Sequence, residues 1–175
     1  MRRRSRTLAL LLSPVVVSCA SGGGSSDFDS YSITVRDDAR GYKYTLEASA
    51  ERIIDALPIV YEYFGFPGGL ASNQDGLVFI SPTATAEGRI YEEAPNSDFL
   101  DCGATVGARQ RADTHIVQFA VITRIVPLDA GGTEIEIILD GRARERAQRL
   151  NAVPCRGKGK LEGEIAALLR SRVGS

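Results

Sequence analysis

Two stretches in the second half of the chain alternate between apolar and polar residues with a period of two. In Thr114 to Val126, one face carries Val117, Phe119, Val121 and Ile125, and the other carries Gln118, Ala120, Ile122 and Arg124. In Thr133 to Arg146, one face carries Ile135, Ile137, Leu139, Gly141 and Ala143, and the other is mostly charged. Because successive side chains of a strand point to opposite faces, we predict two long strands with one buried and one solvated face. The intervening Asp129 to Gly132 is typical of a hairpin turn.

A helical period marks two further segments. In Ala50 to Phe64, one stripe consists of Ile53, Leu57, Val60, Tyr61 and Phe64. Ser49 precedes this stripe as an N-cap, and Pro58 within it predicts a kink because proline has no backbone N–H. Near the C-terminus, a second stripe consists of Leu161, Ile165, Leu168 and Leu169. Each segment therefore predicts an amphipathic helix with one packed face.

Shorter apolar runs predict additional strands. Tyr31 to Val35 and Tyr42 to Leu46 flank the turn-forming residues 37–41 and predict a hairpin. Leu77 to Ser81 and Gly88 to Tyr91 are further strand candidates, and Asp98 to Cys102 is a weaker one. The order of these elements favours an α+β fold, a two-layer sandwich in which two helices pack on one face of an antiparallel sheet of about five to seven strands.

The first residues have the pattern of an export signal. Four arginines, Arg2, Arg3, Arg4 and Arg6, precede the apolar stretch Leu8 to Val17. A spanning helix needs about 20 apolar residues, so this stretch is too short to remain in a membrane. Residues 20–26 are Ala, Gly and Ser only and predict a flexible tether. We therefore divide the chain into a signal (1–18), a tether (19–30) and a single domain (31–173).

The sequence Val16-Val17-Ser18-Cys19 resembles the lipobox of bacterial lipoproteins, and the resemblance covers residues 1–22. It implies cleavage before Cys19 and acylation of both its sulfur and its new amino group, which would anchor the protein to a membrane. Ala20, where Asp would favour retention, implies the periplasmic face of an outer membrane rather than an inner membrane. Val16 departs from the Leu that is commonest in the family. Ordinary secretion with cleavage after Ala20 is the alternative.

The chain has three cysteines, an odd number for an exported protein. If Cys19 carries lipid, Cys102 and Cys155 remain, and both lie in turn-like sequence. An oxidising compartment would allow these two to form a disulfide. The sequence has a single histidine and no Cys-x-x-Cys pair, so we expect no metal site and no cofactor.

The charge of the exported part does not favour binding to nucleic acid. Without the signal, the chain has 17 basic and 22 acidic residues and is therefore net negative. Residues 27–101 carry 14 acidic and 5 basic side chains, whereas residues 142–175 carry 9 basic and 3 acidic ones. This division could orient a protein partner or a membrane surface, but a solvated strand face and helix exterior explain either segment more simply.

Residues with catalytic potential are few, and simpler roles account for them. His115 is the sole histidine, and no Gly-x-Ser-x-Gly accompanies it. Gly157-Lys158-Gly159-Lys160 lacks the spacing of a phosphate-binding loop and reads as a turn before a helix. The pairs Asp37-Asp38 and Glu92-Glu93 lack the spacing of a calcium loop. We therefore expect a protein that is not an enzyme.

The sequence favours a non-catalytic envelope lipoprotein that binds or scaffolds another envelope protein. The alternative is a small-molecule or lipid carrier with a cavity between helix and sheet, lined by Tyr61, Phe64, Phe66, Val117 and Phe119. Core packing explains these apolar residues as well. The order of elements resembles both the domains of BamC-like outer-membrane assembly lipoproteins and the helix-grip fold of START-like lipid-binding domains, and it transfers no site residues.

Overall fold

The structure is a computed structural model that describes residues 41–66, 68–72, 77–91, 94–147 and 151–174. These residues belong to one compact unit. The signal, the tether, Cys19, and the predicted strand Tyr31 to Val35 with its hairpin turn lie outside the described residues, as do Asp37-Asp38 and Glu92-Glu93.

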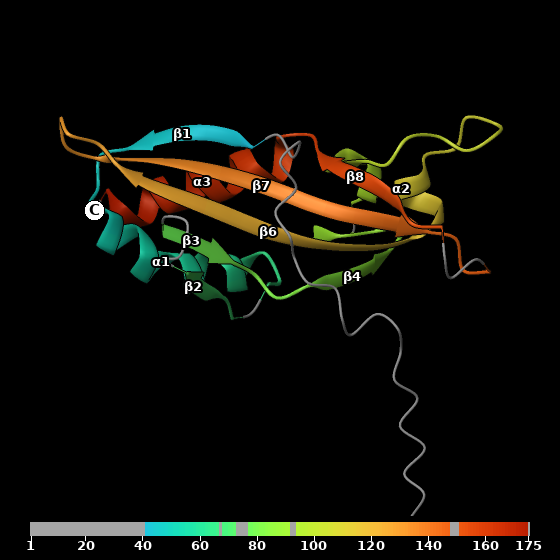
Figure 1. Cartoon of the computed structure of the whole chain (residues 1–175), viewed down its shortest axis with the longest axis horizontal. Coiled ribbons are helices and arrows are strands. Elements are labelled where there is room, and N and C mark those ends of the chain that lie inside the picture. The colour runs from blue at the N-terminus through green and yellow to red at the C-terminus, as the bar shows by residue number, and fades with distance from the viewer. Residues whose placement is uncertain (1–40, 67, 73–76, 92–93, 148–150, 175) are drawn as a thin grey trace, which may run out of the picture. The chain divides into compact units, whose positions relative to one another are not determined.

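All strands of the described residues belong to one antiparallel sheet (Figure 1). They are β1 (Tyr42–Leu46), β2 (Leu70–Ser72), β3 (Leu77–Ile80), β4 (Ala84–Glu87), β5 (Leu100–Asp101), β6 (Ile116–Pro127), β7 (Thr133–Arg144) and β8 (Val153–Gly157). Their order is β2-β3-β6-β7-β8-β5, while β1 pairs with β7 and β4 pairs with β6. The two long strands therefore form the centre of the sheet, and the shorter strands flank them.

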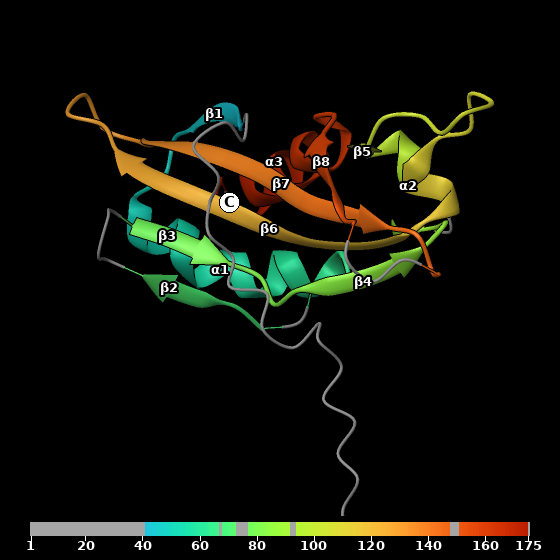
Figure 2. The same ribbon diagram turned by 45° about the vertical axis from the view of Figure 1, so that its right-hand side comes forward.

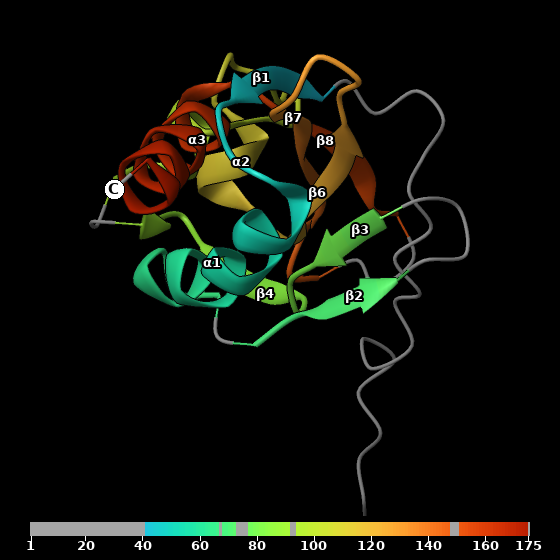
Figure 3. The same cartoon turned by 90° about the vertical axis from the view of Figure 1, so that its left-hand side faces the viewer.

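The helices are α1 (Ala50–Tyr63), the single turn α2 (Arg111–Thr114), and α3 (Lys160–Val173), with a short 3-10 turn at Asn96–Asp98. Both long helices lie on the same side of the sheet (Figure 3). One continuous core joins them to the inward faces of β6 and β7. The predicted α+β sandwich is confirmed.

The first helix begins where the sequence predicts. The Arg52 backbone N–H donates to the Ser49 hydroxyl at 3.4 Å, which satisfies one of the donors that a helix leaves unpaired at its start. The helix continues through Pro58 to Tyr63. At the start of α3, the Gly159 N–H donates to the Glu162 carboxylate at 3.1 Å, and Gly159 adopts the left-handed conformation with φ of 87°. A residue with a side chain would be strained at that position.

Two of the predicted short strands differ from the structure. Gly88 to Tyr91 is not a strand, and β4 occupies Ala84–Glu87 instead. Gly88 has φ of 77°, which ends the strand and turns the chain away from β6. Asp98 to Cys102 contains the end of a 3-10 turn and only the two-residue strand β5.

The outer face of the two long strands is less solvated than predicted. Its buried residues are Ala120, Ile122, Ile138 and Asp140. Ile122 pairs with Ile80 of β3 on one side and with Ile138 of β7 on the other, so three isoleucine side chains form a row across neighbouring strands. Next to this row, Arg124 and Glu136 form an ion pair at 3.1 Å. The prediction of a solvated face is therefore wrong at the centre of the sheet.

Cys102 and Cys155 form a disulfide, as the sequence predicts. Cys102 follows β5, Cys155 lies in β8, and both are buried. Cys155 pairs with Gly141 of β7, and Gly141 in turn pairs with Phe119 of β6. The disulfide therefore links the end of β5 to β8 in the part of the sheet where β6 carries Phe119.

Candidate functional site: an aromatic pocket beside strand β4

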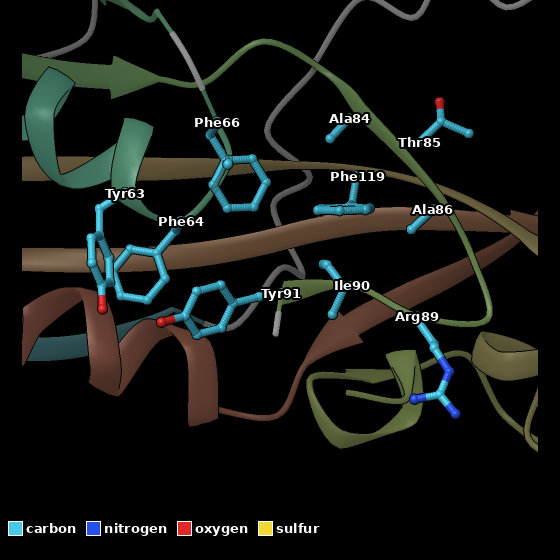
Figure 4. A pocket seen from close by; sticks show the side chains of 11 residues that line it. Tyr63, Phe64, Phe66, Ala84, Thr85, Ala86, Arg89, Ile90, Tyr91 and Phe119 are labelled. Atoms are coloured by element: carbon cyan, nitrogen blue, oxygen red, sulfur yellow. The ribbon is translucent and has the colours of Figure 1, made fainter. Parts of the chain in front are cut away.

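A pocket of about 400 Å³ opens where α1 ends and β4 pairs with β6 (Figure 4). It is lined by Tyr63, Phe64, Gly65, Phe66, Ala84, Thr85, Ala86, Arg89, Ile90, Tyr91 and Phe119. Most of these side chains are aromatic or aliphatic. The surface thus suits an apolar group rather than an ion.

The end of α1 places two of the aromatic rings in the wall. The Phe64 N–H donates to the Tyr61 carbonyl at 3.1 Å, and the Phe66 N–H donates to the same carbonyl at 2.8 Å. Gly65 lies between them with φ of 82°, a conformation that lets the chain reverse direction at little cost. Because of this tight turn, Phe64 and Phe66, on either side of Gly65, both line the pocket.

The rings pack edge to face and at tilted angles around the cavity. Phe66 meets Phe119 of β6 at 5.7 Å between centroids and 87° between planes. Phe64 meets Tyr91 at 4.9 Å, and Tyr63 meets Tyr91 at 6.3 Å. Such contacts fix ring orientations beyond what burial alone provides. The wall is therefore preorganised.

The loop after β4 forms the remaining wall, and several hydrogen bonds hold it. Ile90 donates its N–H to the Ala94 carbonyl at 3.0 Å, and the Asn96 N–H donates to the Gly88 carbonyl at 3.0 Å. The buried Asn96 side chain donates to the Ala112 carbonyl at 2.9 Å, which ties the loop to α2. Ile90 is thereby held beside Phe119, and Tyr91 beside Phe64 (Figure 4).

Apolar surface continues from the pocket onto the outside of α1. Tyr63 is 60% exposed and Ile59, one helical turn earlier, is 49% exposed. Side chains four residues apart lie side by side on a helix, so these two form a strip that leads into the pocket. Contiguous exposed apolar surface of this kind is typical of interaction sites.

The opposite wall is an edge of the sheet. Strand β4 pairs with β6 in the register Ala84 to Phe119 and Ala86 to Val117, and no other strand of the described residues pairs with it. Figure 2 shows β3 and β4 lying one after the other along the same side of β6. At the end of β4, Glu87 forms an ion pair with Arg146, and the exposed Arg89 lies at the rim of the pocket.

The structure brings three of the five predicted cavity residues together. Phe64, Phe66 and Phe119 line the pocket, whereas Tyr61 and Val117 are fully buried in the core and are not part of this wall. The Tyr61 hydroxyl forms a buried hydrogen bond with the Thr123 hydroxyl at 2.7 Å. Burial raises the pKa of Tyr61 well above its usual range, so this phenol stays protonated.

Sequence reasoning missed the other wall residues, including Tyr63, Ile90 and Tyr91. The aromatic residues of Tyr61 to Phe66 were a usable signal. The apolar stripe of the helix accounts for Tyr61 and Phe64 but not for Tyr63, so Tyr63 could have been assigned to a second aromatic surface. The contribution of Tyr91 was hidden by the incorrect strand prediction for Gly88 to Tyr91.

Residues with catalytic potential have structural contacts. Lys158 donates to the Ser97 carbonyl at 2.8 Å, and Lys160 pairs with Asp98 at 3.2 Å while lying over the Phe99 ring. These lysines therefore hold the start of α3 against the 3-10 turn. His115 Nδ1 lies 3.0 Å from the Thr114 hydroxyl.

The described part of the chain holds no cluster of His, Cys, Asp and Glu side chains suited to a metal ion. It also holds no helix long and apolar enough to cross a membrane.

Comparison with known proteins finds no matching family model, no matching curated protein and no matching solved structure.

Proposed function

We propose that this protein is a non-catalytic, lipid-anchored protein of the cell envelope that binds a partner protein, and that the pocket beside β4 is its binding site. The observation that carries the proposal is the continuity of three surfaces: the strip of Ile59 and Tyr63, the aromatic pocket, and the edge strand β4. Together they are suited to a partner larger than the pocket itself.

The anchor part of the proposal rests on the lipobox resemblance at Cys19 and on the Gly/Ser tether that follows. Two or more acyl chains bind a bilayer far more firmly than one, so the domain would stay at the membrane while the tether lets it reach a partner. The disulfide between Cys102 and Cys155 supports an oxidising compartment. The outer membrane, on its periplasmic face, is the proposed location.

The openness of the pocket favours a protein partner over a small molecule. Tyr63, Thr85 and Arg89 line the pocket and are all exposed to solvent. A small ligand is usually enclosed over most of its surface, whereas an apolar side chain of a partner needs only a shallow site and is shielded by the rest of its own protein.

A small-molecule or lipid carrier is the second candidate function, and the observation that favours it is the pocket's size. About 400 Å³ lies within the range of small-ligand sites, and the Phe66 and Phe119 rings offer apolar contacts. Native mass spectrometry of the protein from its own cells tests this candidate. A constant added mass that disappears in a Tyr63→Glu variant would favour the carrier.

Site-specific crosslinking in intact cells tests the partner proposal. A photo-reactive benzoylphenylalanine replaces Tyr63 in the pocket wall, and the matched control carries it at Leu128, another exposed apolar position in the β6–β7 turn. We expect one defined crosslinked product from position 63 and none of the same mass from position 128. Equal products at both positions, or none at position 63, would contradict the proposal.

The anchor has a separate test. Cys19→Ala should move the protein from the membrane fraction to the soluble fraction, because it removes the sulfur that receives lipid. Unchanged fractionation would contradict lipidation and leave the pocket proposal standing.

A further inference from the structure

We infer that one side of the domain lies against the bilayer that holds the proposed lipid anchor. This lipid-facing side consists of strand β1, the loop of residues 103–110 between β5 and α2, and the turn of residues 128–132 between β6 and β7. The inference rests on the anchor part of the proposed function and adds to it the orientation of the domain.

The three segments lie along one side of the domain. Strand β1 runs along its upper edge, and both the loop before α2 and the β6–β7 turn project at that edge (Figures 1 and 2). Figure 3, turned about the same vertical axis, places all three at the same level. Helix α1 and strand β4, which border the pocket, lie at the lower edge in these views. A flat surface can therefore touch the three segments without covering the pocket.

Exposed large apolar side chains of the described residues are concentrated on this side. Four of the six belong to it, namely Tyr42 at the start of β1, Val106 in the loop, and Val126 and Leu128 at the β6–β7 turn. The other two belong to the strip beside the pocket. One exposed apolar residue is ordinary on a protein surface, whereas several on one side are typical of an interaction site. Because the tips are separate, they suit a continuous bilayer better than a single protein partner.

The loop before α2 holds its tip in a fixed conformation. The Thr105 N–H and hydroxyl both donate to the Arg109 carbonyl, at 2.8 and 3.2 Å. The Ala108 N–H donates back to the Thr105 carbonyl at 3.1 Å, and Ala108 adopts φ of 62°, a left-handed conformation that alanine rarely adopts. Backbone strain of this kind is common in segments with a binding role. Its result here is that Val106 is fully exposed.

The charges predict which tip enters the lipid more deeply. Arg109 is exposed and forms no ion pair with another described residue, so it is available to a lipid phosphate. A basic side chain at the surface of an anionic membrane favours binding. The β6–β7 turn carries the exposed Asp129 instead, which such a surface repels. We therefore expect deeper insertion at Val106 than at Leu128.

The described part of the chain also begins on this side. Gly41 directly precedes β1 and follows Cys19 by 22 residues, a length that spans at most about 75 Å. Such a link keeps the domain at a high effective concentration near the bilayer, so contacts that are weak by themselves suffice. Contact through this side would turn the pocket away from the bilayer and toward a partner.

Tryptophan fluorescence in vesicles tests the inference, because the sequence contains no tryptophan and a single introduced one reports its own depth. The full chain, expressed with its signal and purified from membranes, is reconstituted into vesicles of phosphatidylethanolamine and phosphatidylglycerol with or without brominated acyl chains. The variants are Val106→Trp, Leu128→Trp and, as a matched control on α1, Ile59→Trp. We expect the brominated chains to quench Val106→Trp by about twofold or more, Leu128→Trp less, and Ile59→Trp not at all.

Flotation of the vesicles separates this inference from the anchor. Protein that floats but shows no quenching of Val106→Trp, or equal quenching of Val106→Trp and Ile59→Trp, would overturn the inference and leave the anchor and the pocket standing. Protein that does not float would contradict the anchor and the inference together.

A second measurement guards against tryptophan itself drawing a tip into the lipid. Adding Val106→Asp to the Leu128→Trp protein should reduce its quenching, because both tips contact one surface. Unchanged quenching would contradict the inference. Equal melting temperatures of all variants show that the fold is intact.

Discussion

The two halves of strand β6 use similar side chains but are covered in different ways. In the half that pairs with β3, the ring of Tyr61 from α1 packs against the ring of Phe79, with their centroids 5.2 Å apart. The Tyr61 hydroxyl forms a hydrogen bond with the Thr123 hydroxyl of β6. In the half that pairs with β4, α1 has ended, and the rings of Phe64, Phe66 and Tyr91 surround an open pocket. Aromatic residues from one short segment thus complete the core in one half and leave a depression in the other.

The two halves should respond differently to substitution. A buried hydroxyl pair is stable only when both partners are present, so the closed half tolerates little change. In the open half, Tyr63 of the pocket wall is 60% exposed, whereas the rings of Phe64, Phe66 and Phe119 are buried. Exposed apolar surface such as that of Tyr63 contributes little to stability and is typical of a surface that another molecule covers. Substitution of the buried Tyr61 should therefore affect stability, and substitution of the exposed Tyr63 should affect binding.

The largest expected effect comes from the disulfide, which supports the open half through Cys155 and Gly141. Cys102→Ser opens a loop of 53 residues, which costs about 4 kcal/mol in the chain-entropy model. For a domain of this size we expect a drop in melting temperature of about 10 °C in calorimetry. The same melting temperature with and without a reductant would argue against a contribution of the disulfide.

The next effect depends on pH and concerns Glu162, which is buried in α3 away from the pocket wall. Burial raises its pKa from 4.5 to about 7. The folded state therefore holds the proton more tightly than the unfolded state, and the corresponding stability is full below about pH 4.5 and lost as pH rises through 7. The shift corresponds to about 3 kcal/mol.

Glu162→Gln should accordingly raise the melting temperature at pH 8 relative to the parent and change it little at pH 4.5. Glutamine keeps an oxygen that can accept from the Gly159 N–H, so the helix start is preserved. Parallel curves of melting temperature against pH for the two proteins would show that Glu162 does not titrate in this range.

A smaller effect tests the closed half directly. Tyr61→Phe removes one partner of the buried pair and should cost about 2 kcal/mol, because the Thr123 hydroxyl is left without its partner. Adding Thr123→Val should recover part of this loss. A double-mutant cycle in urea measures the coupling, and additive effects of the two substitutions would mean that the hydrogen bond contributes no coupling.

The smallest expected effect lies in the open half. Tyr63→Ser shortens an exposed side chain of the pocket wall and should change the free energy of unfolding by less than about 0.5 kcal/mol. The same urea titration measures it. A loss as large as that of Tyr61→Phe would remove the contrast between the two halves.

Much of the scaffold could be predicted from periodicity. The two long strands, both long helices and the Ser49 cap follow from patterns local to the sequence. The edge of the sheet could not, because β4 depends on the left-handed turn at Gly88 and on pairing with β6 thirty residues later. The dry centre of the outer face depends on Ile80, Ile122 and Ile138 meeting across three strands, which no single strand's pattern contains.

The pocket shows the same limit. Phe64, Phe66 and Phe119 could be proposed from their apolar character, but Tyr61 has the same character, and all four are buried. Only the first three also border the pocket. What separates them is where α1 stops relative to β6. That relation is set by the turn at Gly65 and by the tertiary packing of the helix, and neither is visible as a periodic pattern.

The central claim is that the open half of β6 is covered by a partner, and crosslinking from β4 itself tests it most directly. A photo-reactive residue at Thr85, the exposed position between the two alanines, is compared in intact cells with the same residue at Leu128. We predict a defined crosslinked product at Thr85 that the Tyr63→Glu substitution eliminates. A product at Thr85 that persists unchanged in the Tyr63→Glu protein, or no product at all, would contradict the account.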